Sequence, residues 1–386
     1  MNEHHPSPAP IQRVHGQGFV DYTITRRLPK ILLDIKAELE TQGTFDAAQV
    51  MLQSILDEDP INLEHFARPT DYWQTYLSTL KGLTWGDLPF FDLEFLFYHG
   101  LNSIVSYFDK GIDVFYTTRK RALAEAIPAL DSALVGRPER SERELLYATI
   151  RGSLLANEAD YSQLVTSRNS SKRWAERLLL DDSEQFVSSL VQAPSGMALH
   201  LIADNAGHEL CWDLVMVATL LRQFAGIHVT IHVKPWPMFV SDALAVDIEE
   251  TLEQFLDHRR SPALQSIGQR LRQALEVGQC QVCAEADWGE PRHFNALDKR
   301  LGTRLSHAVG VIVKGDLNYR RLVRDLQWPV DTPTDVATVG VPFRVIALRV
   351  LKSDALVGLE LPIANRAARK IENWKTAGHF AVIQSL

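Results

Sequence analysis

The sequence predicts an α/β protein with a three-layer α/β/α architecture, in which a mostly parallel, doubly wound sheet is preceded by a mainly helical N-terminal region. Two patterns support this fold class. From about residue 22 to residue 190, apolar residues recur at helical spacing, as Leu28, Ile31, Leu32 and Ile35 do. Beyond residue 191, short apolar segments alternate with helical ones, and parallel strands require such crossover connections.

The expected elements of the second half follow a turn at residues 193–196. Strands are predicted at residues 197–203, 227–233, 281–284, 309–316, 344–350 and 379–384, and helices at residues 209–224, 246–256 and 261–277. We therefore divide the chain into a Pro-rich tail expected to be disordered (1–18), a helical N-terminal region (19–190) and an α/β domain (191–386).

Composition excludes several classes of protein. Of the 386 residues, 46% are hydrophobic and 23% are charged, which is typical of a globular protein. The net charge of −8 provides no basic surface for nucleic acid or anionic lipid. The N-terminus lacks a signal-peptide pattern, no apolar run approaches the roughly 20 residues of a membrane span, and three cysteines make no disulfide framework. We expect a cytoplasmic protein without nucleic-acid or membrane partners, and the oligomeric state stays open.

Oxygen-bearing side chains follow the first two predicted strands. Asp204 and Asn205 end the first strand, and Asp242 follows the second. Ligands bind parallel sheets at the carboxyl ends of the strands, so these three side chains are expected at one edge. Carboxylate and amide oxygens suit Mg²⁺ or Mn²⁺. The same residues are also typical of turns and helix caps, so the pattern alone leaves both interpretations open.

Cationic side chains are expected at the same edge of the sheet. Lys314 ends a later strand, and Arg320 and Lys352 follow the ends of two strands. Together with the N-terminus of the helix after Gly207, they provide positive charge for a phosphate group. Phosphoryl transfer needs a metal and cations in this combination. A tight turn at residues 314–316 is the structural alternative.

Other motifs are missing or weak. The sequence has no G-x-G-x-x-G, P-loop or G-x-S-x-G motif, which removes the usual grounds for dinucleotide binding, nucleotide hydrolysis or serine-hydrolase chemistry. Cys280 and Cys283 have the spacing of a zinc site, but no second pair matches them. We interpret both cysteines as ordinary residues in or beside a strand.

Four segments of the sequence resemble the damage-control phosphatase family, formerly a domain of unknown function, in its branch of acidic-residue methyltransferase-like proteins and sugar-phosphate phosphatases. The segments are LIADNAGHELCWDLVMVATLL, HVKPWPMFVSDAL, VKGDLNYRRL and LRVLKSDALVGL. They occur in order, and the resemblance extends from about Trp85 to the C-terminus. It implies an α/β/α fold with a helical N-terminal part, and a metal-dependent phosphatase that acts on a small phosphorylated metabolite.

The resemblance also implies the site residues. A divalent ion, Mn²⁺ or Mg²⁺ with Co²⁺ or Ni²⁺ also possible, would be held by Asp204, Asn205 and Asp242. The residues implied to bind phosphate or substrate are Lys314, Asp316, Leu317, Asn318, Tyr319, Arg320 and Lys352. Glu209 matches an acidic position of the first motif, where it would order a metal-bound water or act as a general base, or serve as an ordinary first-turn residue. Arg349 belongs to the set as a catalytic or supporting residue.

Two departures from the family pattern keep the substrate open. The branch's Arg-Thr-x-Lys motif reads Arg349-Val350-Leu351-Lys352, so the threonine hydroxyl is missing. In FFDLEFLFYHGLN this chain has His99 and Gly100 where the family tends to carry basic residues, which would alter substrate preference if the segment covers the pocket.

The leading hypothesis is hydrolysis of small phosphate monoesters, sugar phosphates such as fructose 1-phosphate or fructose 6-phosphate. An S-adenosylmethionine-dependent protein carboxyl O-methyltransferase and a non-catalytic sugar-phosphate-binding protein are the alternatives. Attack on phosphorus by water, by Asp204 or by Asp316 is not distinguished by spacing.

Overall fold

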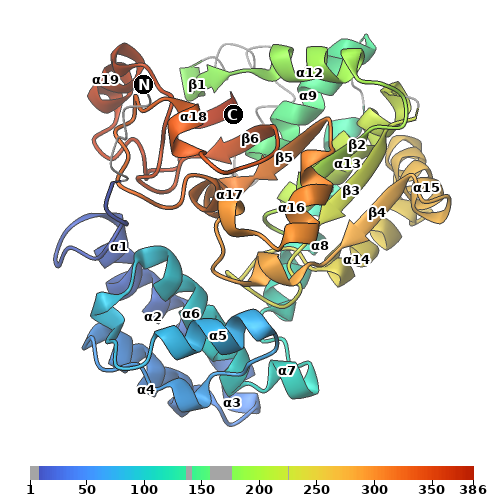
Figure 1. Cartoon of the computed structure of the whole chain (residues 1–386). Coiled ribbons are helices and arrows are strands. Elements are labelled where there is room, and N and C mark those ends of the chain that lie inside the picture. Colours follow the sequence, from blue (N-terminus) through green and yellow to red (C-terminus); the bar gives the residue numbers. More distant parts are fainter. Residues whose placement is uncertain (1–7, 136–140, 157–175, 225) are drawn as a thin grey trace.

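The computed structural model describes residues 8–135, 141–156, 176–224 and 226–386. A sheet covered by helices forms the larger part, and a bundle of short helices from the N-terminal third packs against it (Figure 1). We call the second part the helical bundle. Its helices are α1 (Gly18–Tyr22), a π-helical turn (Thr23–Arg27), α2 (Leu28–Asp34), α3 (Lys36–Thr41), α4 (Phe45–Leu56), α5 (Asp71–Thr79), α6 (Phe90–Ile104) and α7 (Tyr107–Lys110), with short 3-10 turns at Leu63–His65 and Trp85–Asp87.

The sheet has seven strands in the order β1-β7-β6-β5-β2-β3-β4. Every neighbouring pair is parallel except β6 and β7, which are antiparallel. This confirms the predicted mostly parallel sheet. The strands are β1 (Leu178–Asp181), β2 (Ala198–Ile202), β3 (His228–His232), β4 (Cys280–Cys283), β5 (Gly310–Lys314), β6 (Val345–Val350) and β7 (Ala381–Ser385).

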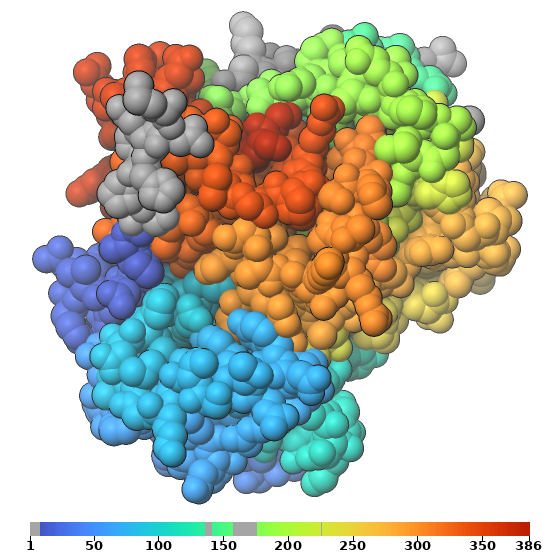
Figure 2. Space-filling model, viewed as in Figure 1, coloured from blue at the N-terminus to red at the C-terminus, as the bar shows by residue number. Residues whose placement is uncertain are grey.

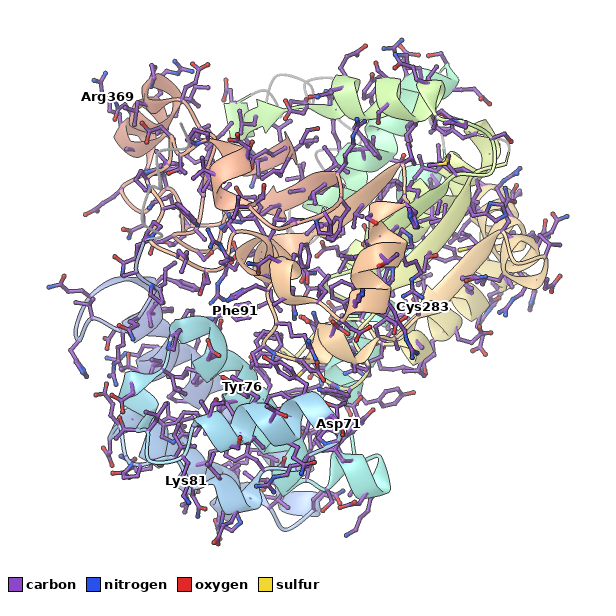
Figure 3. The ribbon with its side chains drawn as sticks, viewed as in Figure 1. Asp71, Tyr76, Lys81, Phe91, Cys283 and Arg369 are labelled. Carbon is purple, nitrogen blue, oxygen red and sulfur yellow. The ribbon has the colours of Figure 1, made fainter. Side chains whose placement is uncertain are left out.

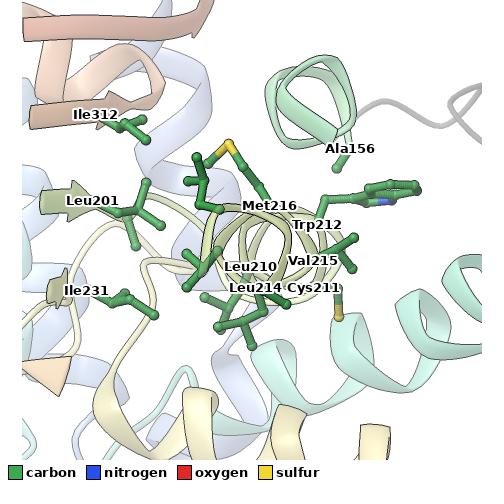
Figure 4. Packing of buried hydrophobic residues seen from close by; sticks show 14 of the residues in the cluster. Ala156, Leu201, Leu210, Cys211, Trp212, Leu214, Val215, Met216, Ile231 and Ile312 are labelled. Atoms are coloured by element: carbon green, nitrogen blue, oxygen red, sulfur yellow. The ribbon is translucent and has the colours of Figure 1, made fainter. Parts of the chain in front are cut away.

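Helices pack on both faces of the sheet, as the alternation of apolar segments predicts. They are α8 (Tyr116–Leu134), α9 (Glu142–Leu155), α12 (Ser183–Gln192), α13 (His208–Gln223), α14 (Ala245–Leu256), α15 (Pro262–Glu276), α16 (Lys299–Ser306), α17 (Gly315–Leu322), α18 (Thr334–Ala337) and α19 (Leu361–Lys370), with 3-10 turns at Ala286–Gly289 and Phe294–Ala296. Figure 4 shows α13 between the strand residues Leu201, Ile231 and Ile312 on one side and Ala156 on the other.

The chain reverses its direction of winding between β2 and β5. The strand that follows β2 in sequence, β3, lies on one side of it, whereas β5 lies on the other. The helices that follow these two strands pack on opposite faces: Leu210 of α13 belongs to one core cluster and Tyr319 of α17 to another. A crevice therefore opens beyond the carboxyl ends of β2 and β5, which is where ligands bind in doubly wound sheets.

The helical bundle covers this end of the sheet. Its core includes Trp236 and Met238, which follow β3, and Leu317 of α17. The space-filling view shows the surface of the bundle directly against that of the α/β part (Figure 2). Sequence periodicity predicted the helices of the bundle but could not predict this position, because the contacts join residues far apart in the chain.

Two expected boundaries differ from the structure. Strand β1 pairs with β7, so the sheet takes a strand from the region that was expected to be mainly helical. Residues 1–7 lie outside the described part of the chain. The rest of the predicted tail is anchored rather than disordered: the Ile11 N–H donates to the Asp325 carbonyl at 3.0 Å, and the Ile11 carbonyl accepts from the Phe90 N–H at 2.8 Å.

The two cysteines of the C-x-x-C pattern are residues of strand β4, as interpreted from the sequence. Both are free thiols. Residues three apart in a strand point to opposite faces of the sheet, so this pair cannot converge on one metal ion.

A pair of buried histidines lies inside the sheet. The Trp288 indole N–H donates to Nδ1 of His232 at 3.2 Å, so Nε2 of His232 carries a hydrogen and donates to Nδ1 of His200 at 2.9 Å. Nε2 of His200 has no hydrogen-bond partner in the described part of the chain. Burial lowers the pKa of His200 to about 4 and the pKa of His232 well below its usual value.

We expect the His200→Asn protein to lose less unfolding free energy than the wild type when the pH is lowered. A histidine with a lowered pKa stays neutral in the folded protein while the unfolded chain takes up a proton, so its contribution is present above about pH 6.5 and is lost as the pH falls toward 4. Linkage predicts a change of about 2 kcal/mol in unfolding free energy between pH 7 and pH 5. Urea unfolding across this range measures it. His258→Asn, at a side chain that is 94% exposed, is the control; an unchanged pH slope in His200→Asn would contradict the assignment.

Candidate active site

A pocket of about 220 Å³ opens at the carboxyl ends of β2, β5 and β6, between the sheet and the helical bundle. Figure 3 shows Phe91 at the boundary where the side chains of the two parts meet. Eight of the predicted site residues line this pocket: Asp204, Asn205, Glu209, Asp242, Asp316, Leu317, Arg320 and Lys352. Lys314, Asn318, Tyr319 and Arg349 do not line it.

Backbone pairing brings the three predicted metal ligands together. Beyond β2 and β3, Asn205 forms an antiparallel bridge with Asp242. The Ala243 N–H donates to the Asp204 carbonyl at 2.8 Å, and the Ala206 N–H donates to the Ser241 carbonyl at 2.7 Å. These bonds extend the two parallel strands into a short antiparallel segment, which fixes Asp242 beside Asn205.

Two strained residues precede Asp242. Phe239 and Val240 have φ angles of 51° and 69°, a left-handed backbone conformation that residues other than glycine rarely adopt. The helical bundle holds this loop, because the Phe239 ring packs 5.1 Å from Phe95 and 4.7 Å from Tyr98. Such conformations persist where the surrounding structure enforces them, and they occur often at functional sites.

The carboxylates of the pocket have too little positive charge around them to stabilise their ionised forms. Burial, Glu209 and Asp242 together raise the pKa of Asp204 well above its usual value. Burial raises the pKa of Asp242 to about 6, although Lys234 opposes this shift. Lys234 Nζ lies 3.4 Å from Oδ2 of Asp242, and this oxygen has no hydrogen-bond partner in the described part of the chain. A cation would stabilise the ionised forms of both aspartates.

The ligand set fits a hard divalent ion that keeps some of its water. Within the described residues, no group of three or more His, Cys, Asp or Glu side chains is arranged to hold a metal. The predicted set instead has two carboxylates and one amide, so other oxygens must complete the coordination. Mg²⁺ is usually bound in this way, through one or two carboxylates, water and substrate phosphate.

Hydrogen bonds fix the orientation of the Asn205 amide. Its Nδ2 donates to Oδ2 of Asp204 at 2.8 Å and to Oε2 of Glu209 at 3.0 Å, and its Oδ1 accepts from the Ser241 hydroxyl. The second oxygen of Glu209 accepts from Lys314 Nζ at 2.8 Å. Both Glu209 oxygens are thus engaged. This geometry supports an orienting role for Glu209 more than the predicted role of general base.

Lys314, which was predicted to bind phosphate, does not line the pocket. Its side chain is fully buried, and Nζ donates to the Ser153 carbonyl at 2.6 Å and to Glu209, and lies 3.0 Å from Oδ1 of Asp213. Burial lowers the pKa of Lys314, but Asp213 and Glu209 outweigh it and leave the pKa raised. The ammonium group is therefore a structural charge behind the site.

Helix geometry explains which residues of the 316–320 segment line the pocket. Asp316, Leu317 and Arg320 lie on the side of α17 that faces the pocket. Asn318 and Tyr319 face the core, where Asn318 Nδ2 donates to the Lys314 carbonyl at 2.9 Å and the Tyr319 hydroxyl donates to Gln384 Oε1 at 2.9 Å. These two side chains do not line the pocket, because a helix presents only one face to it, and their contact with substrate stays a prediction.

Arg320 binds carboxylates from both parts of the molecule. Its Nε and Nη2 each donate to an Asp325 oxygen at 2.8 Å, and its Nη1 donates to Glu94 of α6. Burial lowers its pKa, but Asp325 and Glu94 outweigh this effect and raise it. Arg320 lines the pocket with much of its hydrogen-bonding capacity already used.

Asp316 anchors the loop after β6. Its Oδ1 accepts from Nε of Arg349 at 2.8 Å and from the Lys352 N–H at 3.0 Å. Burial raises the pKa of Asp316, but Arg349 and Arg320 outweigh it and leave the pKa lowered. This anchor places the exposed side chain of Lys352 at the pocket. Val350, where the family pattern has threonine, also lines the pocket.

The pocket residues that come from the helical bundle were not predicted from the sequence. Phe19, Arg27 and Glu94 all line the pocket. Glu94 lies in the aromatic segment that was considered as a cover for the pocket, whereas Phe19 and Arg27 carry no local signal that could have identified them. Their roles depend on the packing of the bundle against the sheet.

Comparison with known proteins identifies the family. A family model described as the damage-control phosphatase ARMT1-like domain matches residues 23–365. The chain belongs to this family. Among its relatives, the damage-control phosphatase ARMT1 of Danio rerio is 27% identical over 85% of this chain and 82% of that protein. The protein of the same name from Homo sapiens is 24% identical over 96% of this chain and 88% of that protein.

A solved structure of a DUF89 family protein from Pyrococcus horikoshii matches with a TM-score of 0.45 and 13% identity, over 93% of this chain and 97% of that chain. The family membership confirms the predicted family and the predicted class of enzyme, a phosphatase. Phosphatases of this family are generally dependent on a divalent metal. In the described part of the chain, no helix is long and apolar enough to cross a membrane.

We expect Gly315→Ala to abolish metal binding. A Cβ at this position, where φ is +81°, would lie 2.0 Å from Oδ2 of Asp204, so the carboxylate must move. Titration with Mn²⁺ followed by electron paramagnetic resonance measures the affinity, and circular dichroism checks the fold. Gly302→Ala is the matched control, because an added Cβ there meets nothing within 4 Å. Unchanged Mn²⁺ affinity in the folded Gly315→Ala protein would contradict this view of the site.

Proposed function

We propose that this protein hydrolyses small phosphate monoesters in the cytoplasm, with sugar phosphates such as fructose 1-phosphate or fructose 6-phosphate as substrates. The proposed ion is Mn²⁺ or Mg²⁺, with Co²⁺ or Ni²⁺ as alternatives, held by Asp204, Asn205 and Asp242. One observation supports this most strongly: the buried carboxylate of Asp242, the half-buried carboxylate of Asp204 and an oriented amide meet at the crevice between β2 and β5, and Lys352 lies at the same pocket.

In this proposal the bound ion would act as a Lewis acid toward a phosphoryl oxygen. Lys352 would bind the other phosphoryl oxygens, since its ammonium group is exposed at the pocket and attached to a loop that Asp316 anchors. Glu209 would keep Asn205 in its ligating orientation through the bond to Nδ2. Arg320, held by Asp325 and Glu94, would contribute a fixed positive charge near the phosphate rather than a mobile clamp.

The hydrogen bonds narrow the choice of nucleophile. Oδ1 of Asp316 already accepts from Arg349 and Lys352, and the lowered pKa of Asp316 makes its carboxylate a weaker nucleophile. Oδ2 of Asp204 accepts from Asn205, whereas Oδ1 of Asp204 accepts no hydrogen bond from the described residues. A water molecule and Asp204 are therefore the two candidates, and trapping a phosphoenzyme with a fluoride-based phosphate mimic distinguishes them.

We expect phosphate release from a panel of sugar phosphates in the presence of Mg²⁺, Mn²⁺, Co²⁺ or Ni²⁺, and none after chelation. Asp204→Asn and Asp242→Asn remove ligand charge and should each reduce kcat/KM about 100-fold or more. Asp335→Asn, an exposed aspartate outside the pocket, is the control. Full metal-dependent activity of Asp204→Asn would refute the proposed site. Transfer of a methyl group from S-adenosylmethionine to a protein carboxylate, without phosphate release, would favour the methyltransferase alternative.

We expect Val350→Thr to improve the use of sugar phosphates. The two side chains are nearly the same size, and Val350 lines the pocket, so threonine adds a hydroxyl without a large change of shape. One neutral hydrogen bond contributes about 1 kcal/mol, which corresponds to a decrease in KM of about five-fold. Steady-state kinetics on fructose 1-phosphate and fructose 6-phosphate measure it. An unchanged KM on both would show that position 350 makes no contact with either sugar.

A further inference from the structure

An unusual turn presents Arg27 to the pocket. Thr23–Arg27 forms a π-helical turn between α1 and α2, and Arg27 is its last residue. Single π-helical turns are rare and occur frequently at functional sites, because the extra residue redirects the side chains that follow. Arg27 lines the pocket together with Phe19, and its guanidinium carbon lies 5.7 Å from the centre of the Phe19 ring.

The charge of Arg27 is not paired directly with a carboxylate of the described residues, although Glu94 interacts with it electrostatically. Its side chain is exposed and makes no hydrogen bond or ion pair with the described residues. Arg320, the other arginine of the pocket, is held by Asp325 and Glu94 instead. An exposed arginine is most often a solvated surface residue. Here the π-helical turn and the position at the pocket both favour a ligand.

Arg27 and Lys352 reach the pocket from different parts of the molecule, Arg27 from the helical bundle and Lys352 from the loop after β6. Burial raises the pKa of Glu94, and the positive charges of Arg320 and Arg27 oppose this shift, so Arg27 lies near Glu94. Lys352 instead acts on Asp204, one of the proposed metal ligands. A phosphate group bound by the metal and Lys352 would therefore leave Arg27 facing the remainder of the substrate.

We propose that Arg27 is a specificity-determining residue that binds an oxygen-bearing group at the end of the substrate remote from the transferred phosphate. An anionic group, a carboxylate or a second phosphate, is the best match, because a guanidinium binds such groups through two parallel hydrogen bonds. The inference rests on the proposed phosphatase function and adds a substrate class to it: phosphate monoesters whose other end is polar, with acidic ones preferred. The helical bundle thereby contributes to specificity and does more than cover the site.

Three probes that differ in the remote group test this inference. Phenyl phosphate has no polar group there, fructose 6-phosphate has hydroxyl groups, and 6-phosphogluconate has a carboxylate. We expect Arg27→Gln to lower kcat/KM about 10-fold or more for 6-phosphogluconate, less for fructose 6-phosphate and not at all for phenyl phosphate, mainly through KM. Arg27→Lys should restore part of the loss. Arg26→Gln is the matched control, because Arg26 precedes Arg27 in the same turn but does not line the pocket.

The outcomes separate this inference from the proposed function. An equal loss on all three probes would overturn it, since Arg27 would then act on the transferred phosphate or on the fold. No loss on any probe would also overturn it and leave Arg27 as a solvated side chain. If the wild-type protein releases no phosphate from any probe, the proposed function fails, and calorimetric binding of 6-phosphogluconate to wild type and Arg27→Gln then tests Arg27 alone: equal affinity overturns the inference, and weaker binding by the variant supports it.

Discussion

The fully buried ammonium group of Lys314 determines how the site is built. Burying a charge costs several kcal/mol unless it is paired and hydrogen-bonded. Lys314 meets this requirement with acceptors from two helices, the Ser153 carbonyl of α9 and the carboxylates of Glu209 and Asp213 in α13. Because Lys314 ends β5, this one group ties a central strand to two helices. Glu209, held in this way, in turn orients the amide of Asn205.

A second group of buried charges joins the helical bundle to the sheet. Arg320 of α17 binds both Glu94 of the bundle and Asp325, and the backbone of Asp325 accepts the hydrogen bond from Ile11. Removing one partner from such a group leaves an uncompensated charge, which is strongly destabilising. The position of the bundle is therefore set by charge pairing as well as by apolar packing, and the pocket is composed of residues from both parts.

Some charged side chains at the pocket lack enough opposite charge around them. Their charges match the ligands expected for a phosphatase of this family, a metal ion and a phosphate group. Behind the pocket, Lys314 and Arg349 are fully paired with carboxylates. At the pocket, the carboxylates of Asp204 and Asp242 have excess negative charge, and Lys352 has an exposed positive charge. A divalent ion complements the carboxylates and a phosphate complements the lysine. Charge balance thus points to a metal ion and a phosphate ester together, as in a phosphatase.

The sequence alone determined the fold class, the order of the main strands and helices after residue 190, and the residues at the ends of β2, β3, β5 and β6. Local spacing is sufficient for this, because strand and helix periodicity and strand ends are properties of short segments. Tertiary structure decided the rest. It directed Lys314 and Tyr319 into the core, since side-chain direction at a strand end or on a helix depends on the packing around it. It also brought Phe19, Arg27 and Glu94 to the pocket, because contacts between distant segments leave no local pattern.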